Sequence, residues 1–166
     1  TGGTQATLVL RTGGNFGGQI TGNIFVGRSN SNLSSNDNTY IGATLITGGT
    51  TTLTDLGRFS GTSAIGIMGG VLAISDGGTV ALANRVNDAA VITLATGTLT
   101  YTGRDNTAST ETLGGIVLSQ GASQITLTNG ANGTRSTDLT IASLTRTSTD
   151  AVVNINTPSG DIGSGT

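Results

Sequence analysis

The chain has 166 residues, a formal net charge of −2 and 28 glycines, with 34% hydrophobic and 3% aromatic residues. Its basic residues are all arginines that stand singly between Arg11 and Arg146, so it lacks the basic cluster and the aromatic platform that nucleic-acid binding needs. Its apolar runs are far shorter than the roughly 20 residues that span a bilayer, and we therefore expect no nucleic-acid partner and no membrane insertion by this segment.

The chain is expected to form ordered β structure. Disordered segments combine high net charge with few β-branched residues, whereas here the net charge is small and Thr, Val and Ile recur in alternation. Cysteine is missing, which excludes disulfides and thiolate metal sites. The chain starts at Thr1 without an apolar leader, and we expect a processed product or a piece of a longer protein.

The first part of the chain contains two apolar runs and one polar segment. Residues 7–10 and the run QITGNIFVG from Gln19 have the pattern of strands, and the glycine pairs in residues 13–18 predict sharp bends between them. Residues 29–37 belong to the most polar stretch of the chain. This segment is expected to be a polar loop.

Residues 38–57, NTYIGATLITGGTTTLTDLG, show the dominant pattern most clearly. Thr44 and Ile46 fall on one face of a first strand, and Thr51 and Leu53 fall on one face of a second. A glycine pair between them predicts a tight bend. The segment is therefore expected to form two short strands joined at a glycine corner.

The same unit returns along the chain, with approximate copies near Ala64 and Val91. Further strands are expected at Ile65 and Ile67, Leu72 and Ile74, Val80 and Leu82, Ile92 and Leu94, Leu99 and Tyr101, and in residues 116–118, 125–127, 139–144 and 152–155. Residues 158–166 are expected to form a flexible tail. Helix is nearly excluded, because no window keeps a 3.6-residue apolar spacing and Thr and Gly disfavour helix.

Short strands that repeat with glycine corners favour a β-solenoid, with coils of roughly 20 to 27 residues. A hairpin meander predicts the same alternation, but its strands are more often joined by Asn-Gly or Asp-Gly turns. We therefore expect residues 1–166 to form a single β-solenoid domain. Ile, Leu, Val and Ala are expected to point inward, and Thr, Ser and Asn outward.

Residues 38–57 resemble the autotransporter-associated β-strand repeat of bacterial surface proteins, which has the pattern N-T-Y-x-G-x-T-x-I-x-x-G-T-L-x-L-x-x-x-G. The matching positions are Asn38, Tyr40, Gly42, Thr44, Ile46, Gly49, Thr50, Leu53 and Gly57. Thr51 stands where the family usually has an inward Leu. With the later pieces, the similarity covers about two thirds of the chain.

The resemblance implies a right-handed parallel β-helix in a passenger-type protein that is extracellular or on the bacterial cell surface. It implies no enzymatic activity. A C-terminal membrane barrel, which would settle export, is not recognisable in this sequence.

β-Helix proteins that bind or degrade polysaccharide offer the main alternative, as lyases or hydrolases with clustered acids and an Arg base. The candidate residues for that chemistry are Asp37, Asp55, Asp76, Asp88 and Asp105, with Arg58, Arg85 or Arg104. Most of them lie beside glycine corners or in loops, where a solvated turn residue is the ordinary interpretation. The chain has no His, which excludes histidine acid-base chemistry.

Calcium is a weaker alternative. Residues 36–38, Asn-Asp-Asn, offer closely spaced oxygen atoms, and residues 75–78 are the nearest fragment to the G-G-x-G-x-D repeat of calcium-binding β-rolls. Neither fragment repeats along the chain. We therefore predict no catalytic, metal-binding or cofactor-binding residue and no cofactor.

The sequence is interpreted as a non-enzymatic extracellular structural or adhesive solenoid. It would serve as a surface stalk or as a subunit of a filament stacked head to tail. Open solenoid ends expose strand edges, so end-to-end or lateral self-association is expected. Surface glycans are possible partners of the Thr and Asn faces, although the few aromatic residues do not support specific sugar recognition.

Overall fold

The structure, a computed structural model, describes residues 6–10, 20–22, 24–28, 31–34, 37–131 and 135–157. In these residues each regular element is a β-strand, and each strand pairing is parallel. This part of the chain contains no helix that could cross a membrane. The prediction of an all-β parallel solenoid is confirmed, while the predicted bends of residues 13–18 and the predicted tail of residues 158–166 lie outside the described residues.

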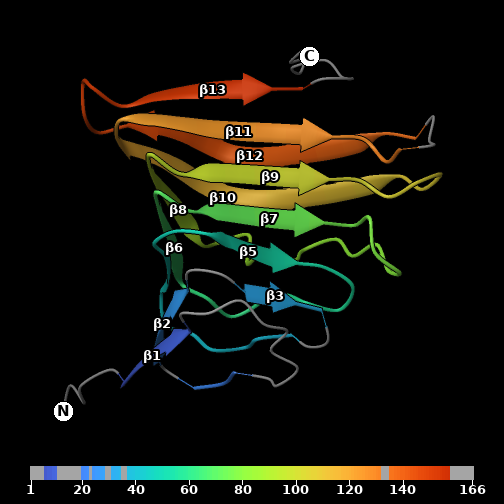
Figure 1. The fold of residues 1–166 in the computed structure, drawn as a ribbon, viewed down its shortest axis with the longest axis horizontal. Coiled ribbons are helices and arrows are strands. Elements are labelled where there is room, and N and C mark those ends of the chain that lie inside the picture. The colour runs from blue at the N-terminus through green and yellow to red at the C-terminus, as the bar shows by residue number, and fades with distance from the viewer. Residues whose placement is uncertain are drawn as a thin grey trace.

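The strands form two parallel sheets, and from β2 onward successive strands alternate between them (Figure 1). In spatial order, the seven-stranded sheet contains β1 (Ala6–Leu10), β2 (Ile24–Arg28), β4 (Thr44–Ile46), β6 (Ala64–Met68), β8 (Val91–Ala95), β10 (Ser109–Gln120) and β12 (Thr137–Arg146). The six-stranded sheet contains β3 (Ser31–Leu33), β5 (Thr50–Leu53), β7 (Val71–Ser75), β9 (Thr98–Thr102), β11 (Ala122–Thr128) and β13 (Val152–Asn156).

Alternation along each strand divides its residues between the core and the surface. In β7, Leu72 and Ile74 are fully buried, while the residues on either side of them are half-buried. This is the period-two pattern that the sequence predicts. Every coil therefore sends its branched apolar side chains into one shared core.

Parallel pairing places equivalent residues of successive coils above one another. In the seven-stranded sheet one inward column consists of Leu8, Val26, Thr44, Ile65, Ile92, Ile116 and Leu144. In the six-stranded sheet one consists of Thr51, Leu72, Leu99, Ile125 and Ile155. Thr51 thus occupies an inward position in a column of Leu and Ile, as the family pattern implies.

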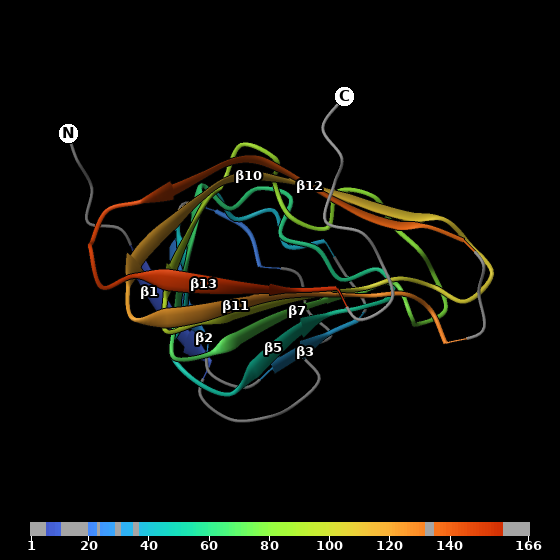
Figure 2. The same ribbon diagram turned by 90° about the horizontal axis from the view of Figure 1, so that it is seen from above.

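A third side of the solenoid closes the core between the ends of the six-stranded sheet and the starts of the seven-stranded sheet. It consists of residues 37–41, 58–62 and 85–90 and of the first halves of β10 and β12, which arch over the six-stranded sheet (Figure 2). In β10 the alternation of burial shifts by one residue at Leu113 and Gly114, where the strand turns from the third side into the sheet. The third side is therefore irregular in the first coils and a strand in the last ones.

The coils lengthen toward the C-terminus. Ala6 pairs with Ile24 at the start of the solenoid, whereas Ala122 pairs with Val152 at its end. The first of these coils is shorter than the sequence predicts, and the last is longer. Apart from a register shift between Leu118 and Gln120 where β10 pairs with β8, the strands keep their register, because the added residues lie in the third side and in the connections between strands.

Residues 38–57 form one of these coils, with β4 and β5 as the two predicted strands. The Tyr40 side chain is fully buried, contacts the Thr44 hydroxyl and packs edge-on against Phe59 with ring centroids 6.0 Å apart. The Asn38 side chain accepts a hydrogen bond from the Ile20 N–H and donates one to the Arg58 carbonyl. The polar residues of this segment therefore join neighbouring coils within the core.

The expectation that Thr, Ser and Asn point outward is wrong at Asn38, Thr44 and Thr51, which are buried. Two of the predicted elements also differ from the structure. Val80 and Leu82 were expected to mark a strand, but they lie in a loop that bends around the buried Arg85 side chain. Residues 29–37 were expected to be a loop, but residues 31–33 form β3. Leu33 aligns with Leu53 in the parallel ladder, and this pairing outweighs the polar composition of the segment.

Gly97, at the corner between β8 and β9, is expected to resist substitution. A Cβ atom there would lie 2.5 Å from the Ile67 carbonyl oxygen, so Gly97→Ala should lower the free energy of unfolding by about 1–3 kcal/mol. Gly27→Ala is the matched control, because its Cβ would meet no atom closer than 3.7 Å. Urea unfolding monitored by circular dichroism measures both variants, and equal midpoints would contradict the close-packed corner.

Candidate functional site

The longest connection between the named strands joins β7 to β8 and comprises residues 76–90. Long connections of this kind in compact folds are often functional. This one carries a fully buried arginine, Arg85, and ends on the third side of the solenoid. The candidate site is therefore built around this loop.

The Arg85 guanidinium is bonded on each of its nitrogen atoms. Nε donates to Oδ1 of Asp76 at 2.7 Å, which forms a buried ion pair. Nη1 donates to the carbonyl oxygens of Asp55 and Gly57 at 2.9 and 3.1 Å, and Nη2 donates to the Val80 carbonyl at 2.9 Å. Arg85 thus ties its own loop to the end of the preceding coil.

Asp76 is satisfied by further donors. Its Oδ1 also accepts from the Leu82 N–H at 3.1 Å, and its Oδ2 accepts from the Tyr101 hydroxyl at 2.9 Å. Burial raises the pKa of Tyr101 far above its usual value, and the Asp76 charge raises it further. The phenol is therefore held in its protonated form as a donor to Asp76.

Glu111 supports the same loop from β10. Its Oε2 and Oε1 accept the backbone N–H groups of Arg85 and Val86, each at 2.9 Å. Burial raises the pKa of Glu111 to about 7, because loss of solvation outweighs the two N–H donors. We call Asp76, Arg85, Tyr101 and Glu111 the buried polar cluster.

The buried polar cluster is closed to solvent. Each of its four side chains is at most about 1% exposed, so a polymeric substrate has no access to the carboxylates. Its hydrogen bonds connect three successive coils. Arg85 donates to the Asp55 carbonyl in the preceding coil, and Glu111 in the following coil accepts the Arg85 N–H. The cluster therefore fixes the position of residues 76–90 on the solenoid.

The other candidate acids and bases make separate contacts along the solenoid and do not form one cluster. Asp37 pairs with Arg58 at 3.3 Å on the third side, and the Arg104 guanidinium donates to the Gly78 carbonyl at 2.6 Å. Asp55 accepts from the N–H and the hydroxyl of Thr79, and the hydroxyl bond is the main cause of its lowered pKa.

No part of the described chain brings three His, Cys, Asp or Glu side chains together around a space for a metal ion. The two fragments considered for calcium each have an acid in a structural contact, since Asp37 pairs with Arg58 and Asp76 with Arg85. Among the predicted candidates, Asp88 and Asp105 remain in exposed loops.

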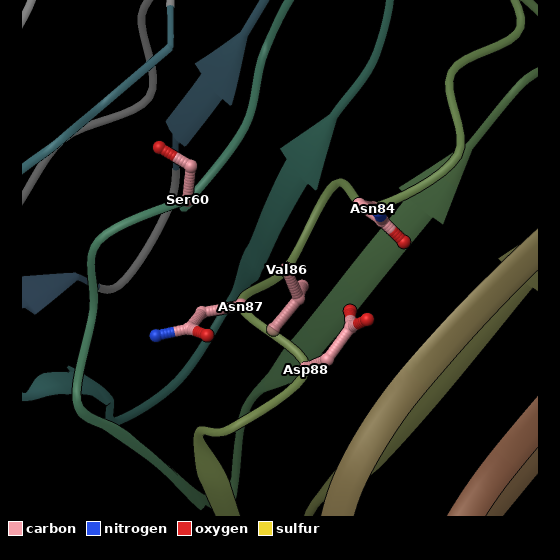
Figure 3. Close-up of a pocket in the computed structure, with 5 residues that line it drawn as sticks. All are labelled: Ser60, Asn84, Val86, Asn87 and Asp88. Atoms are coloured by element: carbon pink, nitrogen blue, oxygen red, sulfur yellow. The ribbon is translucent and has the colours of Figure 1, made fainter.

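Asp88 lines a cavity of about 260 Å³ on the third side, beside the buried polar cluster (Figure 3). Ser60 lines it from one coil, and Asn84, Val86 and Asn87 line it together with Asp88 from the next. Figure 3 shows Val86 between Asn87 on one side and Asn84 and Asp88 on the other. Apart from the fully buried Val86, the lining residues are therefore polar and carry a hydroxyl, two carboxamides and one carboxylate.

Sequence reasoning missed Glu111, Tyr101, Ser60 and Asn84. Tyr101 was assigned to a strand face and Glu111 was not singled out, although an acid at an inward strand position is a signal of a buried polar partner. Ser60 and Asn84 carry no motif. Their proximity arises from the stacking of two coils.

Comparisons of the chain with protein families, with curated proteins and with solved structures find no match.

Proposed function

We propose that this chain is a non-enzymatic structural β-solenoid that serves as an extracellular stalk segment or as a subunit of a filament stacked head to tail. Stacked coils hold a defined shape without disulfides or metal, and they can be extended by adding further coils. The resemblance of residues 38–57 to the autotransporter-associated repeat favours a bacterial surface location. The role is mechanical, with adhesion through the outer faces.

The observation that carries the proposal is that the two outer strands of the seven-stranded sheet end one continuous inward column. β1 and β12 are the outer strands of the seven-stranded sheet, and their inward column ends in Leu8 and Leu144. Leu8 is half-buried and Leu144 is 45% exposed. A second copy stacked head to tail would place its Leu8 on Leu144 and continue both the column and the backbone ladder.

The alternative is a solenoid that degrades polysaccharide. Catalysis of that kind needs acids gathered at an accessible surface. Most of the candidate acids and bases instead make contacts that hold the fold together. These contacts are Asp37 with Arg58, Asp76 with Arg85, Asp55 with Thr79, and Arg104 with Gly78. These contacts favour the structural role over the enzymatic one.

Self-association through the ends is expected to depend on the exposed apolar residues there. Leu144→Lys combined with Ile155→Lys places charge at the edge of each sheet, and it should leave the protein monomeric at concentrations at which the wild type assembles. Sedimentation velocity and negative-stain imaging measure this. Ile41→Lys is the control, because Ile41 is 58% exposed but lies on the third side. A wild-type chain that stays monomeric at every concentration would contradict the filament.

A further inference from the structure

The cavity on the third side contains polar side chains that the fold itself does not use. Ser60, Asn84 and Asp88 are exposed, and their side chains make no hydrogen bond with the described residues. This distinguishes Asp88 from Asp37, Asp55 and Asp76, which are bonded to neighbouring coils. Polar side chains that line one hollow without partners in this part of the chain are available to a ligand.

Hydrogen bonds hold the backbone that carries these side chains in place. The Asn87 side chain donates to the Thr62 carbonyl at 3.0 Å and accepts from the Ala89 N–H at 3.0 Å. The backbone on either side is held by Phe59, whose N–H donates to the Arg85 carbonyl at 2.7 Å and whose carbonyl accepts from the Asn87 N–H at 3.1 Å. Binding there would cost little ordering of the protein, which favours a preformed site.

The chemistry of the side chains that line the cavity indicates the class of ligand that it would bind. Calcium prefers six to eight oxygens with several carboxylates, whereas Asp88 is the single carboxylate that lines this cavity. An anion would need a cation, but the Arg85 guanidinium is buried and fully bonded. A hydroxyl, a carboxamide and a carboxylate instead match a neutral ligand whose hydroxyls both donate and accept.

We infer that this cavity, lined by Ser60, Asn84 and Asp88, is a binding site for one neutral sugar unit. Its volume of about 260 Å³ is smaller than the roughly 300–1,000 Å³ of pockets for drug-sized ligands, which favours a single ring. Asp88 and Asn84 bind ring hydroxyls from one side of Val86, and Ser60 lines the cavity from the neighbouring coil. The site is independent of the ends of the solenoid, so it would be displayed along a stalk or a filament.

Titration of the ¹⁵N-labelled chain with D-glucose, D-galactose, D-mannose and N-acetyl-D-glucosamine tests the site. At least one sugar is expected to shift the backbone amide signals of residue 60 and residues 84–88 with millimolar affinity. Asn84→Gly should weaken binding by about tenfold, because glycine keeps the left-handed backbone of φ 60° and removes the carboxamide. Asp88→Ala should weaken it at least as much.

Asp138→Ala is the control, because it removes an exposed carboxylate on β12 and should leave the titration unchanged. Asp88→Asn, which keeps the size of the side chain, provides an independent variant if either loop variant loses its dispersed spectrum, and it should also weaken binding. Calcium chloride is added in a separate arm. The inference is overturned if no sugar moves these signals, if Asp88→Ala binds as the wild type does, or if calcium alone produces the shifts.

Discussion

Replacing Arg85 with alanine is expected to lower the free energy of unfolding by about 3–5 kcal/mol, the range for breaking a buried ion pair. The substitution leaves the Asp76 carboxylate in the core without its cation and deprives three carbonyl groups of their donor. Buried polar groups without partners carry the full cost of desolvation. Urea unfolding at pH 7, monitored by circular dichroism, gives the difference.

Arg146→Ala is the matched control for this experiment. Arg146 is an exposed arginine at the end of β12, and its loss should change the free energy of unfolding by less than about 0.5 kcal/mol. The double variant Arg85→Met, Asp76→Asn removes both charges and should recover part of the loss, because no uncompensated charge remains in the core. A loss below about 1 kcal/mol for Arg85→Ala would mean that the ion pair does not hold the loop.

The strands were predictable because each depends on local alternation. Ile65 with Ile67 and Leu99 with Tyr101 lie on buried faces, as the period-two pattern indicates. The stacking of coils followed from the repeat, since each coil must place its apolar face on the next one. Parallel pairing was expected from the resemblance of residues 38–57 to a β-helix repeat.

The third side and its cluster could not be derived in the same way. The Val80 and Leu82 alternation predicts a strand, but the loop is shaped by Arg85, whose guanidinium bonds the Val80 carbonyl. Asp76 and Arg85 were recognised as an acid and a base of interest, yet their mutual contact depends on the fold of the loop. Glu111 reaches Arg85 from one coil further on, where no sequence motif connects them.

The cavity depends in the same way on how adjacent coils align. Ser60 and Asn84 come from adjacent coils, which approach through the bridge between Phe59 and Val86. Coil length varies along the chain, so the sequence alone does not state which loop residues become neighbours. Sequence reasoning therefore identified Asp88 as a candidate but not the residues that surround it.

Glu111 is expected to make stability fall as pH rises from about 4.5 to 7. Burial raises the pKa of this carboxyl from its ordinary 4.5 to about 7 in the folded protein. Within that window the folded chain keeps a proton that the unfolded chain has released, so raising the pH favours unfolding. The contribution is about 3 kcal/mol across the window, at about 1.36 kcal/mol per pKa unit, and it is complete above pH 7.

Glu111→Gln isolates this effect, because glutamine has a similar shape and does not titrate. Its amide provides one acceptor for two N–H donors, so the variant should be less stable than the wild type at pH 4.5, and residue 111 should add no pH dependence to the stability of the variant. Asp55, whose pKa is lowered, loses its stabilising bond at acidic pH in both proteins and cancels from the difference. Urea unfolding at several pH values between 4.5 and 8.5 should show the advantage of the wild type shrinking as pH rises. A constant difference would mean that Glu111 is ionised throughout, with its two N–H donors outweighing burial.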